Sequence, residues 1–118
     1  MTPEGKVKHD IKKMLRSFGA WYYMPVPGGY GAPSLDFICS YHSVTFAIEA
    51  KAPGKRPTLR QNATMTDMEN AGIRTFVIDG DLAELEAWLY LVKERVPVIK
   101  KLLGSGQTLE QALYEAKQ

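Results

Sequence analysis

Every second residue in the segment 35–51 is apolar on either side of a polar pair at 42–43. A period of two is typical of strands with one buried face, and two such runs around a short polar break predict a β-hairpin. With 42–43 as the turn, Leu35 lies opposite Ala50, and the other apolar pairs are Phe37–Ile48, Cys39–Phe46 and Tyr41–Val44. A shift of one residue would move these side chains to the other face, so the pattern constrains the register strongly.

The same register places Asp36 directly across from Glu49, on the face opposite to the apolar pairs. Directly opposed residues have Cβ atoms about 5 Å apart, so the two carboxylates repel each other unless a cation lies between them. Lys51 follows Glu49 by two residues and therefore shares this face. We predict a divalent metal at the two acids with Lys51 beside it; a surface salt bridge between Lys51 and either acid is the alternative.

The segments around the hairpin predict alternating helices and strands. Thr2 and Gly19 are typical of the two ends of a helix. We expect a helix over 3–18, a strand over 20–24, a helix capped by Thr58 and running to Ala71, a strand over 73–78, a helix from residue 82 that ends or restarts at Pro97, and a last helix capped by Thr108. The strand after the helix at 58–71 should run parallel to its neighbour, which gives an α/β fold with a mixed sheet between helices.

Composition limits the domain organisation. A chain of 118 residues with 45% hydrophobic residues suffices for one core, so we expect a single domain over 1–118, with a core at 3–79 and a helical part at 81–118. Because Cys39 is the only cysteine, an intrachain disulfide and a cysteine zinc site are excluded. No segment resembles a signal peptide or a membrane span, so we expect a cytoplasmic protein without a membrane partner.

Other polar residues could complete a site around the acids. Glu4 lies one turn before Val7 on the apolar stripe of the first helix, where it either joins the metal site or complements the helix dipole. Gln61 is expected on the inward face of its helix, where a polar group needs a partner. A basic loop follows the hairpin and would attract a phosphate, unless it is simply solvated; its charged residues are Lys55, Arg56 and Arg60.

These residue types point to phosphodiester hydrolysis. Carboxylate oxygens are hard ligands that suit Mg²⁺ or Mn²⁺. Such a cation neutralises charge on a scissile phosphate and makes a bound water nucleophilic, while Lys51 would orient that water or stabilise the developing charge. None of the candidate groups reads a base edge, which predicts recognition of backbone shape over sequence.

Asp36, the Glu49-Ala50-Lys51 segment and the expected order of elements together resemble the PD-(D/E)xK nuclease superfamily. Within it, AIEAKAPGKRPTLRQ followed by AGIRTFVIDG is similar to the VRR-NUC family of virus-type replication-repair nucleases, and the similarity spans about residues 4–79. The resemblance implies a restriction-endonuclease-like core in the order α-β-β-β-α-β, plus C-terminal helices. It also implies that Asp36, Glu49 and the Ala50 carbonyl bind Mg²⁺ or Mn²⁺, that Lys51 assists catalysis, and that Glu4 and Gln61 complete the site.

The family also implies an activity and partners. Its small members are associated with phage or bacterial genomes, with homodimers, and with cleavage of branched DNA such as four-way (Holliday) junctions. By that resemblance the protein is a Mg²⁺- or Mn²⁺-dependent endodeoxyribonuclease of a bacterial or phage-infected cell.

Two other classes of function remain open. A non-catalytic nucleic-acid-binding module with the same fold is suggested by the mild net charge of +2 and by GAPSLD, which stands where the family often has Gly-x-Pro-Asp. A structural or protein-interaction domain would rest on the apolar C-terminal helices, which could equally form a homodimer face.

Overall fold

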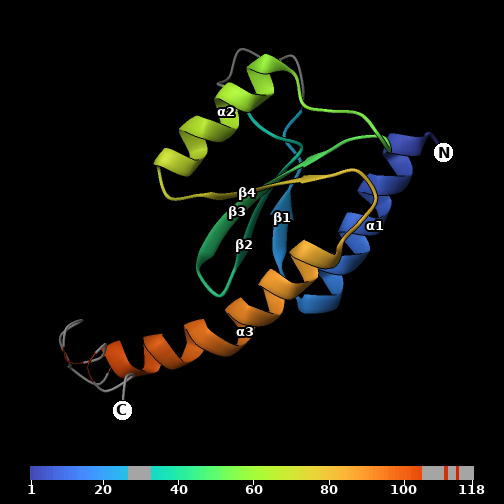
Figure 1. The fold of residues 1–118 in the computed structure, drawn as a ribbon. Helices are drawn as coiled ribbons and strands as arrows, with labels where there is room; N and C mark the ends of the chain where they lie inside the picture. The colour runs from blue at the N-terminus through green and yellow to red at the C-terminus, as the bar shows by residue number, and fades with distance from the viewer. Residues whose placement is uncertain (27–32, 105–110, 112–113, 115–118) are drawn as a thin grey trace.

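Four strands form one mixed, open sheet in the order β1-β2-β3-β4 (Figure 1). The computed structural model describes residues 1–26, 33–104, 111 and 114. The strands are β1 (Trp21–Tyr23), β2 (Phe37–Tyr41), β3 (Val44–Ala50) and β4 (Arg74–Ile78). β2 runs antiparallel to both β1 and β3, and β4 runs parallel to β3. The expected mixed sheet between helices is therefore confirmed.

The central hairpin has the register that the period of two predicts. Phe37 lies opposite Ile48, and Tyr41 lies opposite Val44. His42 and Ser43 form the connection with φ values of 48° and 66°. Two successive left-handed residues are the conformation of a type I′ turn, whose twist matches that of the flanking strands. The turn thus fixes which residues of β2 and β3 meet.

The first helix, α1 (Pro3–Phe18), begins and ends at the residues that the sequence indicates. The Thr2 side chain accepts a hydrogen bond of 3.0 Å from the Gly5 amide. At the other end, Gly19 adopts a left-handed conformation with a φ of 78°, and its N–H reaches the last carbonyls of the helix. Between these caps the helix buries Val7, Ile11 and Leu15 against the sheet.

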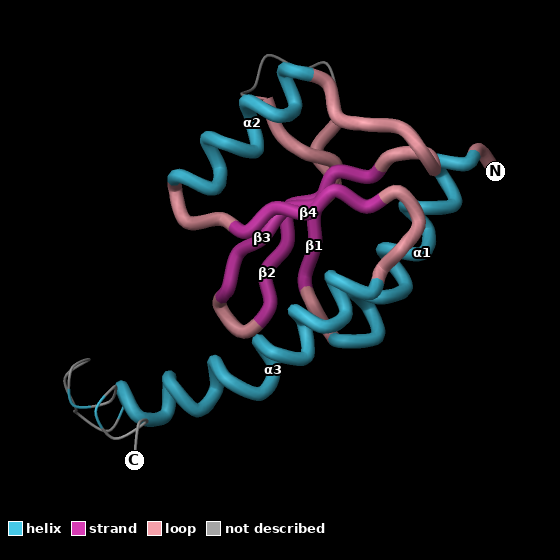
Figure 2. Tube along the Cα trace, in the orientation of Figure 1, coloured by secondary structure: helices cyan, strands magenta, loops and turns pink. Residues whose placement is uncertain are grey.

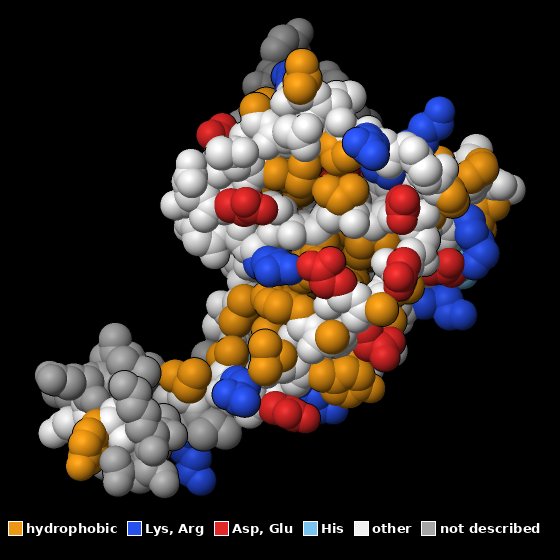
Figure 3. All heavy atoms as spheres, in the orientation of Figure 1, with side chains coloured by type: hydrophobic (Ala, Val, Ile, Leu, Met, Phe, Trp, Pro, Cys, Tyr) orange, Lys and Arg blue, Asp and Glu red, His pale blue; other side chains and the backbone are white. Residues whose placement is uncertain are grey.

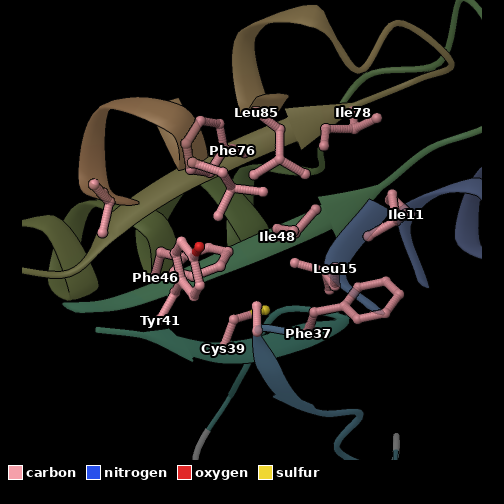
Figure 4. Close-up of a cluster of buried hydrophobic side chains, with 14 of the residues drawn as sticks. Ile11, Leu15, Phe37, Cys39, Tyr41, Phe46, Ile48, Phe76, Ile78 and Leu85 are labelled. Carbon is pink, nitrogen blue, oxygen red and sulfur yellow. The ribbon is translucent and has the colours of Figure 1, made fainter. Parts of the chain in front are cut away.

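One face of the sheet packs against α1 and α3 (Ala83–Gly104). Figure 4 shows this core, in which Phe37, Cys39 and Ile48 lie beside Ile11 and Leu15 of α1. An aromatic cluster ties α3 to β3 and β4, since the Trp88 ring lies 4.9 Å from that of Phe46 and 5.4 Å from that of Phe76. Edge-to-face contacts of this kind stabilise beyond the area they bury.

The other face of the sheet packs against α2 (Leu59–Asn70) (Figure 2). Its buried cluster is smaller and contains Leu35, Ala47 and Met65. The buried cluster is therefore larger on the face that packs against α1 and α3 than on the face that packs against α2.

Two expectations about the fold are wrong. Leu35 does not join the face of Phe37, because the chain bends at Asp36 before β2 begins, and Leu35 packs on the α2 face instead. Pro97 does not end the third helix, since α3 continues to Gly104. Pro97 removes the N–H partner of the Lys93 carbonyl, but Lys93 lies on an exposed part of α3, where water can replace that partner.

The last helix expected from Thr108 lies outside the described residues, apart from Gln111 and Tyr114, which are helical. Within the described part of the chain, no helix combines the length and the apolar composition needed to cross a bilayer.

Candidate active site

Asp36 lies at the end of the sheet where β2 begins, and its carboxylate contacts the main chain of β3. Asp36 Oδ2 accepts a hydrogen bond of 2.9 Å from the Ala50 amide. The next amide, that of Lys51, points the other way and donates to the Ile78 carbonyl of β4 at 2.9 Å. In regular strand pairing, a main-chain partner on β2 would receive the Ala50 N–H. Because the chain bends at Asp36, the side chain takes that place.

This geometry also orients the carbonyl of Ala50. The N–H and C=O of one residue in a strand point to the same neighbouring strand. The Ala50 carbonyl therefore faces the side of β3 on which Asp36 lies. Two oxygen ligands from different segments, one a carboxylate and one a carbonyl, thus face the same end of the sheet.

Glu49 is the one charged residue that is buried among the described residues, with 4% of its surface exposed. The helix α2 covers Glu49 on this face of the sheet. Glu49 Oε1 accepts a hydrogen bond of 3.0 Å from Gln61 Nε2 and lies 3.8 Å from Lys51 Nζ. The buried carboxylate is therefore held by an amide and an ammonium group.

Gln61 is held in turn by the start of α2. The side-chain oxygen Oε1 of Gln61 accepts a hydrogen bond of 2.9 Å from the main-chain amide of Thr58, and the main-chain amide of Gln61 donates to Thr58 Oγ1 at 3.1 Å. This reciprocal pair is a capping box. Because Gln61 Oε1 accepts from the Thr58 N–H, the side-chain NH₂ group of Gln61 must be the group that faces Glu49. The helix cap thus determines which group of Gln61 enters the site.

The electrostatics of the acid pair favour an added cation. The pKa of Glu49 is raised from 4.5 to about 7, first by burial and then by the charge of Asp36 and a hydrogen bond with it, while the Lys51 charge opposes this rise. A carboxylate next to a second carboxylate resists ionisation. A divalent cation bound between the two acids would replace this repulsion by attraction.

Lys8 is the residue of this site that the sequence interpretation missed. Its Nζ lies 3.7 Å from Asp36 Oδ1 and 3.6 Å from Glu4 Oε2. Glu4 therefore does not lie directly beside Asp36; the ammonium group of Lys8 lies between the two carboxylates. The spacing of four residues between Glu4 and Lys8, typical of helical ion pairs, was the available signal.

The donor set fits a small hard cation that keeps part of its water. Among the described residues there is no group of three or more His, Cys, Asp or Glu side chains placed to hold a metal ion. The protein ligands would be Asp36, Glu49 and the Ala50 carbonyl. Mg²⁺ is usually held in proteins by one or two carboxylates and several waters, so this set suits Mg²⁺ or Mn²⁺.

The basic loop lies between β3 and α2. It turns at Gly54, with a hydrogen bond of 3.0 Å from the Lys55 amide to the Ala52 carbonyl. Lys55 and Arg56 lie in this loop, whereas Arg60, which was expected in the same loop, lies in the first turn of α2. All three side chains are exposed, and none forms an ion pair with another described residue. Figure 3 shows lysine and arginine side chains dispersed among acidic ones on the face in view.

The structure brings Asp36, Glu49, Lys51 and Gln61 together, with Glu4 reached through Lys8. No protein-family model matches this sequence, and no curated protein matches it.

Proposed function

We propose that this protein is a metal-dependent endonuclease that hydrolyses phosphodiester bonds of DNA. The observation that carries the proposal is the pair of Asp36 and Glu49, in which the buried carboxylate of Glu49 lies beside the half-buried one of Asp36 and is ionised less readily because of it. Ionising a buried acid beside a second acid costs free energy, so a cation that pairs with both would stabilise the arrangement.

In this proposal each residue has a separate task. A bound Mg²⁺ or Mn²⁺ would supply charge neutralisation at the phosphate and a water of lowered pKa. Asp36, Glu49 and the Ala50 carbonyl would hold it, and Gln61 keeps Glu49 in place through its hydrogen bond. Lys51, 3.8 Å from Glu49, would donate to the phosphate or orient the attacking water.

The fold and the substrate complete the proposal. The elements from α1 to β4 would form a restriction-endonuclease-like core, in keeping with the resemblance to the VRR-NUC family. Lys55, Arg56 and Arg60 would hold flanking phosphates, so DNA shape rather than sequence is selected. Branched DNA, such as a four-way junction, and a homodimer that matches its symmetry follow from the same resemblance.

A cleavage assay tests the proposal. Fluorescent four-way junction and linear duplex are incubated with wild-type protein in Mg²⁺, in Mn²⁺ or in EDTA. We expect metal-dependent cleavage that Glu49→Gln abolishes and Lys51→Met lowers by about 100-fold or more. Glu86→Gln, which changes an exposed acid on α3, is the matched control and should cleave normally. Undiminished cleavage by Glu49→Gln, or none by the wild type, would remove the proposal.

The second candidate is a DNA-binding module without chemistry. Lys8 favours it, since this ammonium group already neutralises part of the charge on Asp36. In that case the wild-type protein binds the junction equally in Mg²⁺ and in EDTA and leaves it intact.

A further inference from the structure

Two large aromatic side chains on β1 are exposed on the same face of the sheet. Trp21 is 61% exposed and Tyr23 54% exposed. Tyr22, between them, points to the opposite face and packs against the main core. Trp21 and Tyr23 therefore lie on the α2 face of the sheet, about 7 Å apart along the strand.

The strand pairing places both rings on the face that carries Glu49, with Tyr23 nearer to this acid than Trp21. Tyr23 lies opposite Ile38, and Ile38 lies opposite Ala47. Paired residues of neighbouring strands point to one face, so Tyr23 and Ala47 share a row across that face. Glu49 lies two residues beyond Ala47, which puts it about 12 Å from Tyr23 by strand and sheet spacing.

The α2 helix leaves this part of the face open. Its contacts reach Ala47 and the partly buried Ile38, but not the two exposed rings of β1. β1 contains three residues, so the free edge of the sheet at this strand is short for pairing with another strand. The exposed rings therefore suit a ligand that contacts side chains rather than the strand edge.

We propose that Trp21 and Tyr23 form a platform on which unpaired DNA bases stack next to the cleaved phosphate. The inference rests on the proposed function in one respect, namely that DNA is the substrate. Stacking on an exposed ring is tolerant of sequence because every base has a π-face, and exposed aromatic side chains on a sheet stack bases in other nucleic-acid-binding folds. The substrate class is therefore DNA with unpaired nucleotides at or beside the cut, such as a flap or an opened branch point.

Tryptophan fluorescence tests the platform without cleavage. Wild-type protein in EDTA is titrated with an unpaired 20-mer of thymidylate and, separately, with a blunt 20-base-pair duplex. We expect the thymidylate to quench emission and the duplex to leave it largely unchanged. Trp21→Phe should abolish the quenching, because the remaining tryptophan, Trp88, lies among Phe46 and Phe76 in the core.

Affinity measurements give a second test. Trp21→Ala and Tyr23→Ala should each weaken binding of the thymidylate by about tenfold and change duplex binding by less than about twofold. Leu91→Ala, which removes an apolar side chain of 51% exposure on α3, is the control and should change neither. Equal losses for both DNAs, or no quenching of the wild type, would overturn the platform.

The outcomes separate this inference from the proposed activity. Metal-dependent junction cleavage without quenching overturns the platform and leaves the nuclease. Selective quenching without cleavage in Mg²⁺ or Mn²⁺ supports the platform and overturns the nuclease. A blue shift of Trp21 emission with protein concentration, in the absence of DNA, would mean that a second copy covers these rings and would also overturn the inference.

Discussion

Replacing Glu49 by glutamine should remove a pH-dependent loss of stability from the metal-free protein. Burial first, and then the neighbouring Asp36, raise the pKa of Glu49 from 4.5 to about 7 in the folded state. Between pH 4.5 and about pH 7, Glu49 therefore carries a proton in the folded protein that the unfolded chain has released. The free energy of unfolding falls as the pH rises through this range and is constant above it.

The size of this loss follows from the two pKa values. A change from 4.5 to about 7 corresponds to roughly 3 kcal/mol, of which about 2 to 3 kcal/mol falls between pH 5 and pH 8. Glutamine mimics the protonated acid, since its oxygen can still accept from Gln61 and its NH₂ group can donate to Asp36. The variant should therefore keep its low-pH stability at pH 8.

Urea denaturation in EDTA at pH 5, 6, 7 and 8 measures the effect. With a slope of about 1 to 3 kcal/mol per molar urea for a small domain, the wild-type midpoint should drop by about 1 to 2 M and that of Glu49→Gln by much less. His9 and His42 are exposed and present in both proteins, so any contribution from them cancels in the comparison. Asp36→Asn should give an intermediate dependence, because it removes the neighbouring charge but not the burial. Equal pH dependence of wild type and Glu49→Gln would refute the reasoning.

Three further variants probe the surroundings of the acids. Gln61→Glu keeps the oxygen that caps α2 but replaces the donated hydrogen bond by a repelling carboxylate, so the metal-free protein should lose about 1 to 3 kcal/mol at pH 8 in urea denaturation; unchanged stability would contradict the assigned contact. Lys8→Gln removes a competing ammonium group and should tighten Mn²⁺ binding severalfold in calorimetry, whereas weaker binding would mean that Lys8 supports the site. A triple variant combines Lys55→Gln, Arg56→Gln and Arg60→Gln. It should lower the slope of log affinity against log salt for duplex DNA by roughly 2 to 3, whereas the control Lys93→Gln on α3 should lower this slope by less than about one.

Local signals in the sequence predict much of the fold. Thr2 and Gly19 predict the two ends of α1 correctly, because helix caps depend on hydrogen bonds between residues that are close in the sequence. The register of β2 and β3 follows from the alternation and from a two-residue turn, both of which are local. The position of Asp36 next to Glu49 follows from that register.

Other features depend on contacts between distant segments. The burial of Glu49 depends on where α2 lies over the sheet, which the pattern within β3 does not contain. The contact of Lys8 with Asp36 depends on how α1 approaches the start of β2. Pro97 indicates a helix end by its own chemistry, but the flanking residues keep the helical conformation.

The continuation of α3 through Pro97 has a consequence for local opening. Leu85, Leu89 and Val92 attach the first part of this helix to the sheet, whereas the part beyond Val96 extends away from it (Figure 1). The helix has one main-chain hydrogen bond fewer at Pro97, and a helical segment without tertiary packing is only marginally stable in water. A single continuous helix should therefore exchange its amide hydrogens in two stages, with the outer turns opening at a small fraction of the free energy of global unfolding.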